Sequence, residues 1–292
     1  MKILLIGKNG QVGHELQRTL LPLGELVVLG RDALDLSDSA ALNQVLESQA
    51  ADVIVNASAY TAVDRAEADE AGAMAVNAAA VSAMAAYARS HDALLVHYST
   101  DYVFDGDKQA PYIEDDATAP QSAYGRSKRA GEEAILASAC KALVFRTSWV
   151  FSVHGGNFIK TMLRLAGERD SLNVVADQFG APTSAELIAD VTALAIAAYR
   201  RGALADGIYH LTAAGETSWH GLASYAIERA QARGLALKVA AAQIKPIPTE
   251  AYPLPARRPR NSRLDTSKLS SALDLQMPAW QVYVDRLIDQ LS

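Results

Sequence analysis

The sequence has few of the residues that hold disulfide-linked or zinc-centred proteins together. Among its 292 residues there is one cysteine, Cys140, which cannot form an internal disulfide and has no partner for a thiolate metal site. The six histidines are scattered, and none has the HExxH spacing of a zinc-binding helix. We therefore expect neither a disulfide framework nor structural zinc.

The chain also lacks an excess of positive charge. It has 27 Lys and Arg against 33 Asp and Glu, a formal net charge of -6. Such a chain has no overall basic surface for non-specific nucleic-acid binding, so we expect no nucleic-acid partner. An anionic substrate would need a local basic pocket.

No apolar run in the sequence has the pattern of a targeting segment or a membrane span. The first run, residues 3–6, is too short for the core of a signal peptide. The stretch 71–88 is mostly alanine and contains Asn77 and Ser82, which suits a buried helix better than a membrane span. We expect a cytoplasmic protein with no membrane partner.

The first half of the chain alternates short aliphatic runs with helix-like segments. This alternation predicts βαβ units and a parallel sheet, and the apolar runs fit strands covered on both faces. Composition alone leaves open an α/β domain without a cofactor. The aliphatic runs are residues 3–6, 26–29, 53–55, 94–96 and 143–145, and the helix-like segments lie near 11–21, 38–49, 70–90 and 123–138.

The pattern loosens after residue 150. The stretch 245–263 holds five prolines, which exclude a long helix or a central strand. We interpret 1–150 as a dinucleotide-binding domain and 151–292 as a smaller substrate-binding lobe, with 184–211 able to return to the large sheet. The helices expected in this half lie near 156–169, 184–201, 218–233 and 279–290.

A glycine-rich turn follows the first aliphatic run and opens the first helix. Gly7 permits a tight turn, Gly10 lets the backbone approach a pyrophosphate, and Gly13 lets the helix pack on the strand. The free N–H groups at the start of the helix favour phosphate. The turn predicts dinucleotide binding on a Rossmann-type, doubly wound parallel sheet, against the alternative of a merely structural turn.

The end of the second strand bears on the choice of cofactor. Gly30 leaves room there and Arg31 could meet a 2′-phosphate, which favours NADPH, whereas Asp32 could bind the ribose of NADH. Asp35 and Leu36 could flank the adenine. The alternative for this pair is a helix-capping loop.

Small residues follow the third strand, at the edge of the sheet where ligands bind in open α/β folds. The stretch 56–61 (Asn-Ala-Ser-Ala-Tyr-Thr) lets a cofactor lie close to the backbone.

Tyr124 and Lys128 stand four residues apart in an expected helix, so both side chains face one site. A free phenol has a pKa of about 10, and a nearby ammonium lowers it. We therefore expect Lys128 to lower the pKa of Tyr124, and Tyr124 to protonate a carbonyl oxygen as hydride reaches carbon. Lys128 could also hold the nicotinamide ribose. The alternative is an exposed helix face on which the two residues recur by chance.

Thr100 follows the fourth aliphatic run, which places it at the same sheet edge. Its hydroxyl would polarise a substrate carbonyl and complete a Thr-Tyr-Lys triad with Tyr124 and Lys128. The alternative is a strand-end hydroxyl that caps local backbone.

With these motifs, the chain resembles the extended short-chain dehydrogenase/reductases that modify nucleotide sugars, and among them the reductases of dTDP-4-keto sugars. The resemblance covers essentially the whole chain. It implies reduction of the C4 ketone in the last step of dTDP-L-rhamnose formation, with NADPH or NADH as cofactor. The stretches that carry it are residues 7–13, 99–104, 124–128, 146–150, 177–183 and 256–259.

The resemblance also implies roles for single residues. Thr100 and Asp101 would touch the sugar, Trp149 would contact the substrate, Tyr124 would donate the proton and Lys128 would support it. Further residues would line the cofactor: Gly10, Gln11 and Val12 at the pyrophosphate, and Ala59, Tyr60, Thr61 and Tyr98 elsewhere.

The resemblance further implies a homodimer, in which Glu15 and Glu186 match acidic positions associated with Mg²⁺ at the interface. The alternative is two ordinary surface glutamates. Some relatives have an acidic residue where this chain has Gly30, which counts against a preference for NADH.

Two further features concern the substrate. Related dehydratases carry an Asp-Glu pair after the threonine, whereas here Asp101 is followed by Tyr102, which favours reduction over elimination. Four arginines in residues 257–263, Arg257 among them, could bind a diphosphate with their guanidinium forks. A reductase or epimerase of another nucleotide sugar, and a non-catalytic cofactor-binding relative, are left as alternatives.

Overall fold

The computed structural model describes residues 1–291 and is built around a six-stranded sheet. The strand order is β10-β5-β4-β3-β1-β2, and every neighbouring pair is parallel. This confirms the Rossmann-type doubly wound sheet. The strands are β1 (Lys2–Ile6), β2 (Glu25–Leu29), β3 (Val53–Asn56), β4 (Leu94–Thr100), β5 (Lys141–Thr147) and β10 (Gly207–His210).

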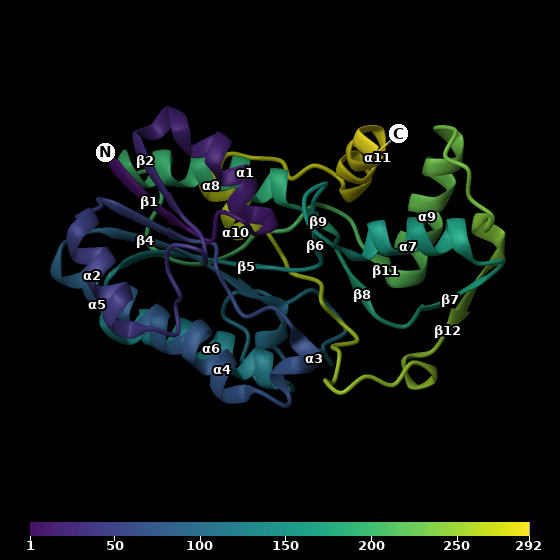
Figure 1. Cartoon of the computed structure of the whole chain (residues 1–292), viewed down its shortest axis with the longest axis horizontal. Helices are drawn as coiled ribbons and strands as arrows, with labels where there is room; N and C mark the ends of the chain where they lie inside the picture. Colours follow the sequence, from purple (N-terminus) through teal and green to yellow (C-terminus); the bar gives the residue numbers. More distant parts are fainter. Residues whose placement is uncertain (292) are drawn as a thin grey trace.

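Helices cover both faces of this sheet (Figure 1). Alternate residues of β1 divide between two cores: Ile3 and Leu5 pack on one side, Leu4 and Ile6 on the other. The first side holds α1 (Gln11–Leu20), α8 (Ala185–Arg200) and α10 (Ser267–Leu273), and the second holds α2 (Ser39–Gln49), α5 (Ala80–Ser90) and α6 (Ala123–Ser138). This two-sided burial explains why the strands are apolar almost throughout.

The alanine-rich stretch forms one irregular helix, Glu70–Ser90, which by length and composition alone could cross a membrane. It consists of α4 (Glu70–Met74), a π-helical turn (Ala75–Ala79) and α5. Buried residues of α5, such as Val81 and Met84, pack in the second core beside Ile135 of α6. In this structure the stretch is therefore a core helix of the domain.

A smaller lobe lies beside the sheet (Figure 1). In it α7 (Phe158–Glu168) packs against α9 (Trp219–Ala232), and β7 (Leu172–Val175) pairs with β12 (Ile244–Ile247). Pro246 lies in β12, a strand of a two-stranded sheet, where its missing N–H is tolerated. The remaining α-helices and strands are α3 (Val63–Ala66), β6 (Val150–Phe151), β8 (Phe179–Gly180), β9 (Thr183–Ser184), β11 (Thr217–Ser218) and α11 (Trp280–Leu291).

The chain crosses between the two parts more than once. After the first residues of the smaller lobe, α8 packs on α1 and β10 joins the edge of the large sheet beside β5. The chain then returns to the smaller lobe through β11 and α9. The residues 184–211 therefore belong spatially with the large sheet.

Candidate active site

The glycine turn lies between β1 and α1, beside the point where the strand order reverses. Gly7 has φ +99°, a conformation that favours glycine, and a Cβ on Gly13 would lie 2.0 Å from the carbonyl oxygen of Gly7. Gly10 is exposed and is the N-cap of α1. Because glycine has no side chain, no side-chain cap accepts from the first backbone N–H groups of the helix. Half-buried Gln11 and Val12 begin that helix. The turn is thus a suitable cradle for a pyrophosphate.

The residues expected near the adenosine lie after β2 and differ in how many of their polar groups are already bound. Arg31 is exposed beside buried Gly30, and Asp32 forms an ion pair with Lys8 (3.1 Å), whose hydrogen bond is the main cause that lowers the pKa of Asp32. Asp35 accepts hydrogen bonds from the backbone and hydroxyl of Ser37 (2.9 and 2.8 Å).

Leu36, next in the chain, is 6% exposed and packs in the second core. For this segment the geometry favours the capping loop, since Asp38 then caps α2 by accepting from the backbone N–H of Ala41 (3.0 Å).

The loop after β3, which contains Ala59, Tyr60 and Thr61, is held in place by Asn77 from the π-helical turn. Its side chain accepts a hydrogen bond from the Tyr60 N–H (2.9 Å) and donates to the Tyr60 carbonyl (3.1 Å) and to Ser127 Oγ (3.0 Å). Sequence reasoning missed this role, although Asn77 is a lone amide among alanines.

Thr100 and Tyr124 meet at the carboxyl end of β4. The Thr100 hydroxyl donates to Asp101 Oδ1 (3.1 Å) and accepts the N–H of Tyr102 (3.2 Å), so it also caps the next turn. Burial raises the pKa of Tyr124 to about 12, while its hydrogen bond with Thr100 acts in the opposite direction. The phenol is therefore protonated at neutral pH, as a free phenol also is.

Lys128 follows Tyr124 by one turn of α6, a helix whose N-cap Ser122 accepts the N–H of Gly125 (3.1 Å). Lys128 is 2% exposed, and its Nζ donates to the carbonyl of Tyr98 (2.6 Å), beside Nε2 of His97 (3.2 Å). Burial lowers the pKa of Lys128 to about 8.

The expectation that Lys128 lowers the pKa of Tyr124 is therefore wrong for this structure. The Lys128 side chain reaches back to the backbone of β4, and the pKa of Tyr124 is raised by burial instead.

Asp101 is a buried carboxyl at the same edge, 3% exposed. Burial raises its pKa to about 6, although hydrogen bonds with Ser262 and Thr100 counteract this. Its Oδ2 has no hydrogen-bond partner within residues 1–291. Because a buried, unpaired oxygen is costly, the atom is suited to accept a hydroxyl of a bound sugar.

Trp149 lies between β5 and β6 with φ +51°, unusual for a large side chain. Its ring stacks on Trp219 of α9, with centroids 3.6 Å apart and an angle of 11°. Gly180 makes room for it, since a Cβ there would lie 2.7 Å from Trp149 Cε2. Trp219, which sequence reasoning did not single out, donates to Gln178 Oε1 (3.1 Å).

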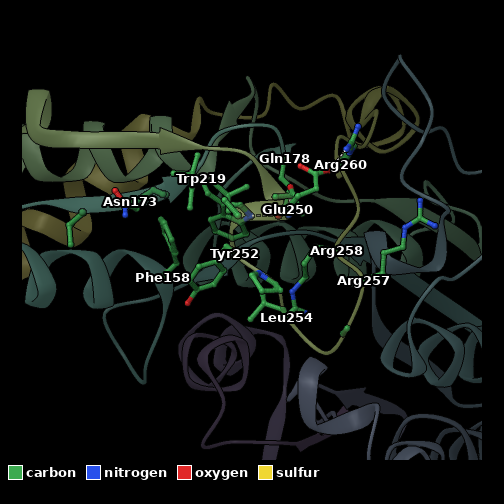
Figure 2. Close-up of a pocket in the computed structure, with 18 of the residues that line it drawn as sticks. Phe158, Asn173, Gln178, Trp219, Glu250, Tyr252, Leu254, Arg257, Arg258 and Arg260 are labelled. Carbon is green, nitrogen blue, oxygen red and sulfur yellow. Dashed lines mark hydrogen bonds and ion pairs between the residues drawn. The ribbon is translucent and has the colours of Figure 1, made fainter.

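A cleft of about 1020 Å³ opens between the smaller lobe and the loop after β4. Figure 2 shows aromatic side chains on one part of it and arginines on another. Its aromatic lining includes Tyr102, Phe158, Trp219 and Tyr252, and its arginines are Arg169, Arg257, Arg258 and Arg260.

The three arginines of the 257–263 stretch that line the cleft differ in their partners. Arg257 is exposed and reaches Asp107 at 3.5 Å, and Arg260 pairs with Glu250 at 2.6 Å. Arg258 donates from Nη2 to Asp64 (2.6 Å), and its Nη1 is buried without a partner in residues 1–291. Arg258 is thus better placed than Arg257 to bind an anion inside the cleft.

The two glutamates expected at a metal do not form a site within one protomer. Glu15 lies on α1 with His154 Nε2 at 3.9 Å, and Glu186 on α8 is bound by Arg286 (2.9 Å). Among residues 1–291 no group of three or more His, Cys, Asp or Glu side chains could hold a metal ion.

The whole chain, residues 1–292, matches the family described as RmlD substrate binding domain. The chain belongs to this family. It is 50% identical to a dTDP-4-dehydrorhamnose reductase of Burkholderia thailandensis, over 100% of this chain and 99% of that protein.

Solved structures agree with this membership of the RmlD family. A dTDP-4-dehydrorhamnose reductase from Clostridium acetobutylicum superposes with a TM-score of 0.90 at 35% identity, covering 100% of this chain and 99% of that one. The enzyme of the same name from Bacillus anthracis, solved in complex with NADP, gives a TM-score of 0.88 at 33% identity and covers 99% of both chains.

In this RmlD family member, the structure brings Thr100, Tyr124 and Asp101 together at the sheet edge, whereas Lys128 is bound to the Tyr98 carbonyl of β4. Two of the expected ligand-binding residues are engaged elsewhere in the protein. Leu36 is buried in the core, and Glu186 is ion-paired with Arg286.

Proposed function

We propose that this protein reduces the C4 ketone of dTDP-4-dehydro-β-L-rhamnose to give dTDP-L-rhamnose, with a nicotinamide cofactor as reductant. The observation that carries the proposal is the meeting of the Thr100 hydroxyl and the Tyr124 phenol at the carboxyl edge of the sheet, the edge that also carries the glycine turn. The name dTDP-4-dehydrorhamnose reductase, borne by a relative identical at half of all positions, supports the choice of substrate.

The reaction needs hydride at C4 and a proton at the C4 oxygen. A nicotinamide cofactor, when bound, would supply the hydride. Tyr124 supplies the proton from its phenol, which like any ordinary phenol is protonated at neutral pH. Thr100 orients the ketone oxygen, and Asp101 accepts a sugar hydroxyl with its unpaired Oδ2.

This site is not suited to catalyse the elimination of water from the sugar. Tyr102 stands where the related dehydratases have a glutamate, and its ring contacts the edge of Tyr124 with centroids 5.6 Å apart. Without a second carboxylate beside Asp101, the site lacks the acid–base pair that elimination needs.

We infer NADPH as the preferred cofactor, with NADH also accepted. Exposed Arg31 beside the small Gly30 leaves space and positive charge for a 2′-phosphate. Asp32, bound to Lys8, is less available for a ribose hydroxyl. The Bacillus anthracis relative was solved with NADP, which agrees with this inference.

The nucleotide part of the substrate would occupy the cleft. Arg258 offers a buried, unpaired Nη1 for a diphosphate oxygen, and exposed Arg257 lies at the rim. Tyr252 and Phe158 offer aromatic faces for a base or sugar.

We also propose a cytoplasmic homodimer, on the strength of the family resemblance. The exposed apolar side chains of Leu194 on α8 (49%) and Val282 on α11 (50%) are suited to burial against a second copy.

No catalytic step is assigned to Mg²⁺, because Glu186 is held by Arg286, and we expect turnover to persist in excess EDTA.

The direct test is oxidation of NADPH or NADH by the dTDP-4-keto sugar, followed by the loss of the reduced cofactor's absorbance. Oxidation with formation of dTDP-L-rhamnose is expected. If neither cofactor is oxidised, the proposed function is wrong.

A further inference from the structure

A buried imidazole lies directly behind Lys128. His97, on β4, is 0% exposed. Its Nε2 lies 3.2 Å from Lys128 Nζ, and its Nδ1 lies 3.2 Å from Nδ2 of Asn56, on the neighbouring strand β3. The mechanism above uses neither His97 nor Asn56.

Asn56, His97 and Lys128 form a row of side chains joined by hydrogen bonds. The positions of its hydrogens can be assigned by starting at Asn56. The backbone N–H of Ser58 donates to Oδ1 of Asn56 (3.1 Å), which fixes the orientation of the amide. Nδ2 of Asn56 therefore faces His97, and because an amide NH₂ only donates, Nδ1 of His97 must accept. Burial holds the pKa of His97 well below its ordinary value, so the imidazole is neutral and carries its one hydrogen on Nε2.

This assignment constrains Lys128. The Nε2–H of His97 points at Nζ, and an ammonium has three hydrogens and no lone pair, so two donors would face each other. A neutral amine accepts from Nε2–H and still donates to the carbonyl of Tyr98 (2.6 Å). Every hydrogen bond in the row is satisfied only when Lys128 is neutral.

We propose that His97 and Asn56 are positioning residues for the reaction: Asn56 fixes the hydrogen of His97 on Nε2, and His97 thereby favours the neutral amine of Lys128 and holds it against β4. The part concerning the reaction rests on the proposed function. The lysine held in this way follows Tyr124, the residue that loses a proton in each turnover, by one turn of α6. Burial acts in the same direction, lowering the pKa of Lys128 to about 8.

The other groups around Lys128 do not replace this effect. Glu132, on the same helix, favours the charged amine. It is bound by Arg146 of β5 (2.7 Å) and also by Arg129, which offset its charge. The hydroxyl of Tyr98 is bonded to Thr192 of α8 (2.8 Å), and burial raises its pKa, so it stays protonated.

The first test is the tautomer of His97 in the full protein, read by NMR with isotope-labelled histidine and assigned with the variant His97→Gln. We expect the hydrogen on Nε2 at neutral pH. In Asn56→Asp, a carboxylate oxygen replaces Nδ2 and accepts from Nδ1, so the hydrogen should move to Nδ1. A hydrogen on Nδ1, or an imidazolium, in the unmodified protein would overturn the proposal.

The second test is the pH profile of kcat/KM. Relaxing the constraint on His97 should raise the pKa of Lys128, so the alkaline limb should move upward by about one pH unit in Asn56→Asp. The matched control is Asn56→Ala, which removes the donor without adding charge and should move the limb in the same direction. A shift in Asn56→Asp alone would be an effect of the new charge and would refute the proposal.

Different results would refute the reductase function and the role of His97. The tautomer is measured without substrate, so an unreactive keto sugar would defeat the reductase proposal and leave the assignment of His97 intact. If Asn56→Ala does not fold, the tautomer of the unmodified protein still decides. Reductase activity with the hydrogen on Nδ1 would defeat only the role of His97.

Discussion

The ion pair between Glu132 of α6 and Arg146 of β5 joins the catalytic helix to the sheet. Both oxygens of Glu132 accept from the guanidinium, at 2.8 Å from Nε and 2.7 Å from Nη2. The two side chains are 0% and 2% exposed. Removing the carboxylate in Glu132→Ala leaves a buried cation without its partner, so we expect a loss of about 3–5 kcal/mol in the free energy of unfolding.

Glu133, the next residue on the same helix, offers a matched control. Its ion pair with Arg129 (3.2 Å) is solvent-exposed, and Glu133→Ala should therefore cost at most about 1 kcal/mol. Urea denaturation of the two variants and the unmodified protein gives both values. Equal stability of Glu132→Ala and Glu133→Ala would refute the argument that burial gives the first pair its weight.

The pair also has a defined pH dependence. Burial alone would raise the pKa of Glu132, but the hydrogen bond and charge of Arg146 outweigh it, and the pKa lies below its ordinary value. A lowered carboxyl pKa adds stability above the ordinary value of about 4.3, and this stability is lost as the pH falls towards the folded-state pKa. The difference between the unmodified protein and Glu132→Ala should thus shrink in acid, and a constant difference would contradict the assignment.

Three further predictions concern the cofactor and substrate. Gly13→Ala should abolish cofactor binding, measured by fluorescence titration, because its Cβ would lie 2.0 Å from the oxygen of Gly7, and normal binding would contradict that overlap. Arg258→Ala should raise KM for the dTDP-sugar about tenfold or more and leave KM for NADPH unchanged, with a smaller effect in exposed Arg257→Ala, and the reverse order would place the diphosphate elsewhere. Arg31→Ala should lower kcat/KM for NADPH and not for NADH, and an unchanged ratio would exclude a role for Arg31.

Much of the large sheet could be predicted because its strands are buried on both faces. The aliphatic runs 3–6 and 143–145 lie inside β1 and β5, and the expected helix 123–138 has the bounds of α6. The glycine turn was predictable for a different reason, since Gly7 and Gly13 obey local steric rules that hold in any fold.

Contacts between distant segments could not be predicted in this way. Spacing along a helix places Tyr124 and Lys128 on one face, but only the packing of α6 against β4 directs Lys128 to the carbonyl of Tyr98. The stacking of Trp149 on Trp219 joins residues seventy positions apart, and Arg258 differs from Arg257 only through its burial beside Asp64. The smaller lobe was harder to predict because several of its strands, such as β8 and β9, are only two residues long.

The central claim is that Tyr124 delivers the proton to the C4 oxygen. The most direct measurement compares kcat for oxidation of NADPH by the dTDP-4-keto sugar in the unmodified protein and in Tyr124→Phe, with the affinity for NADPH measured in both. We predict a loss of about 10²–10⁴-fold in kcat with cofactor affinity unchanged, since the variant removes only the hydroxyl that donates the proton. Turnover of the variant at the rate of the unmodified protein would contradict the account.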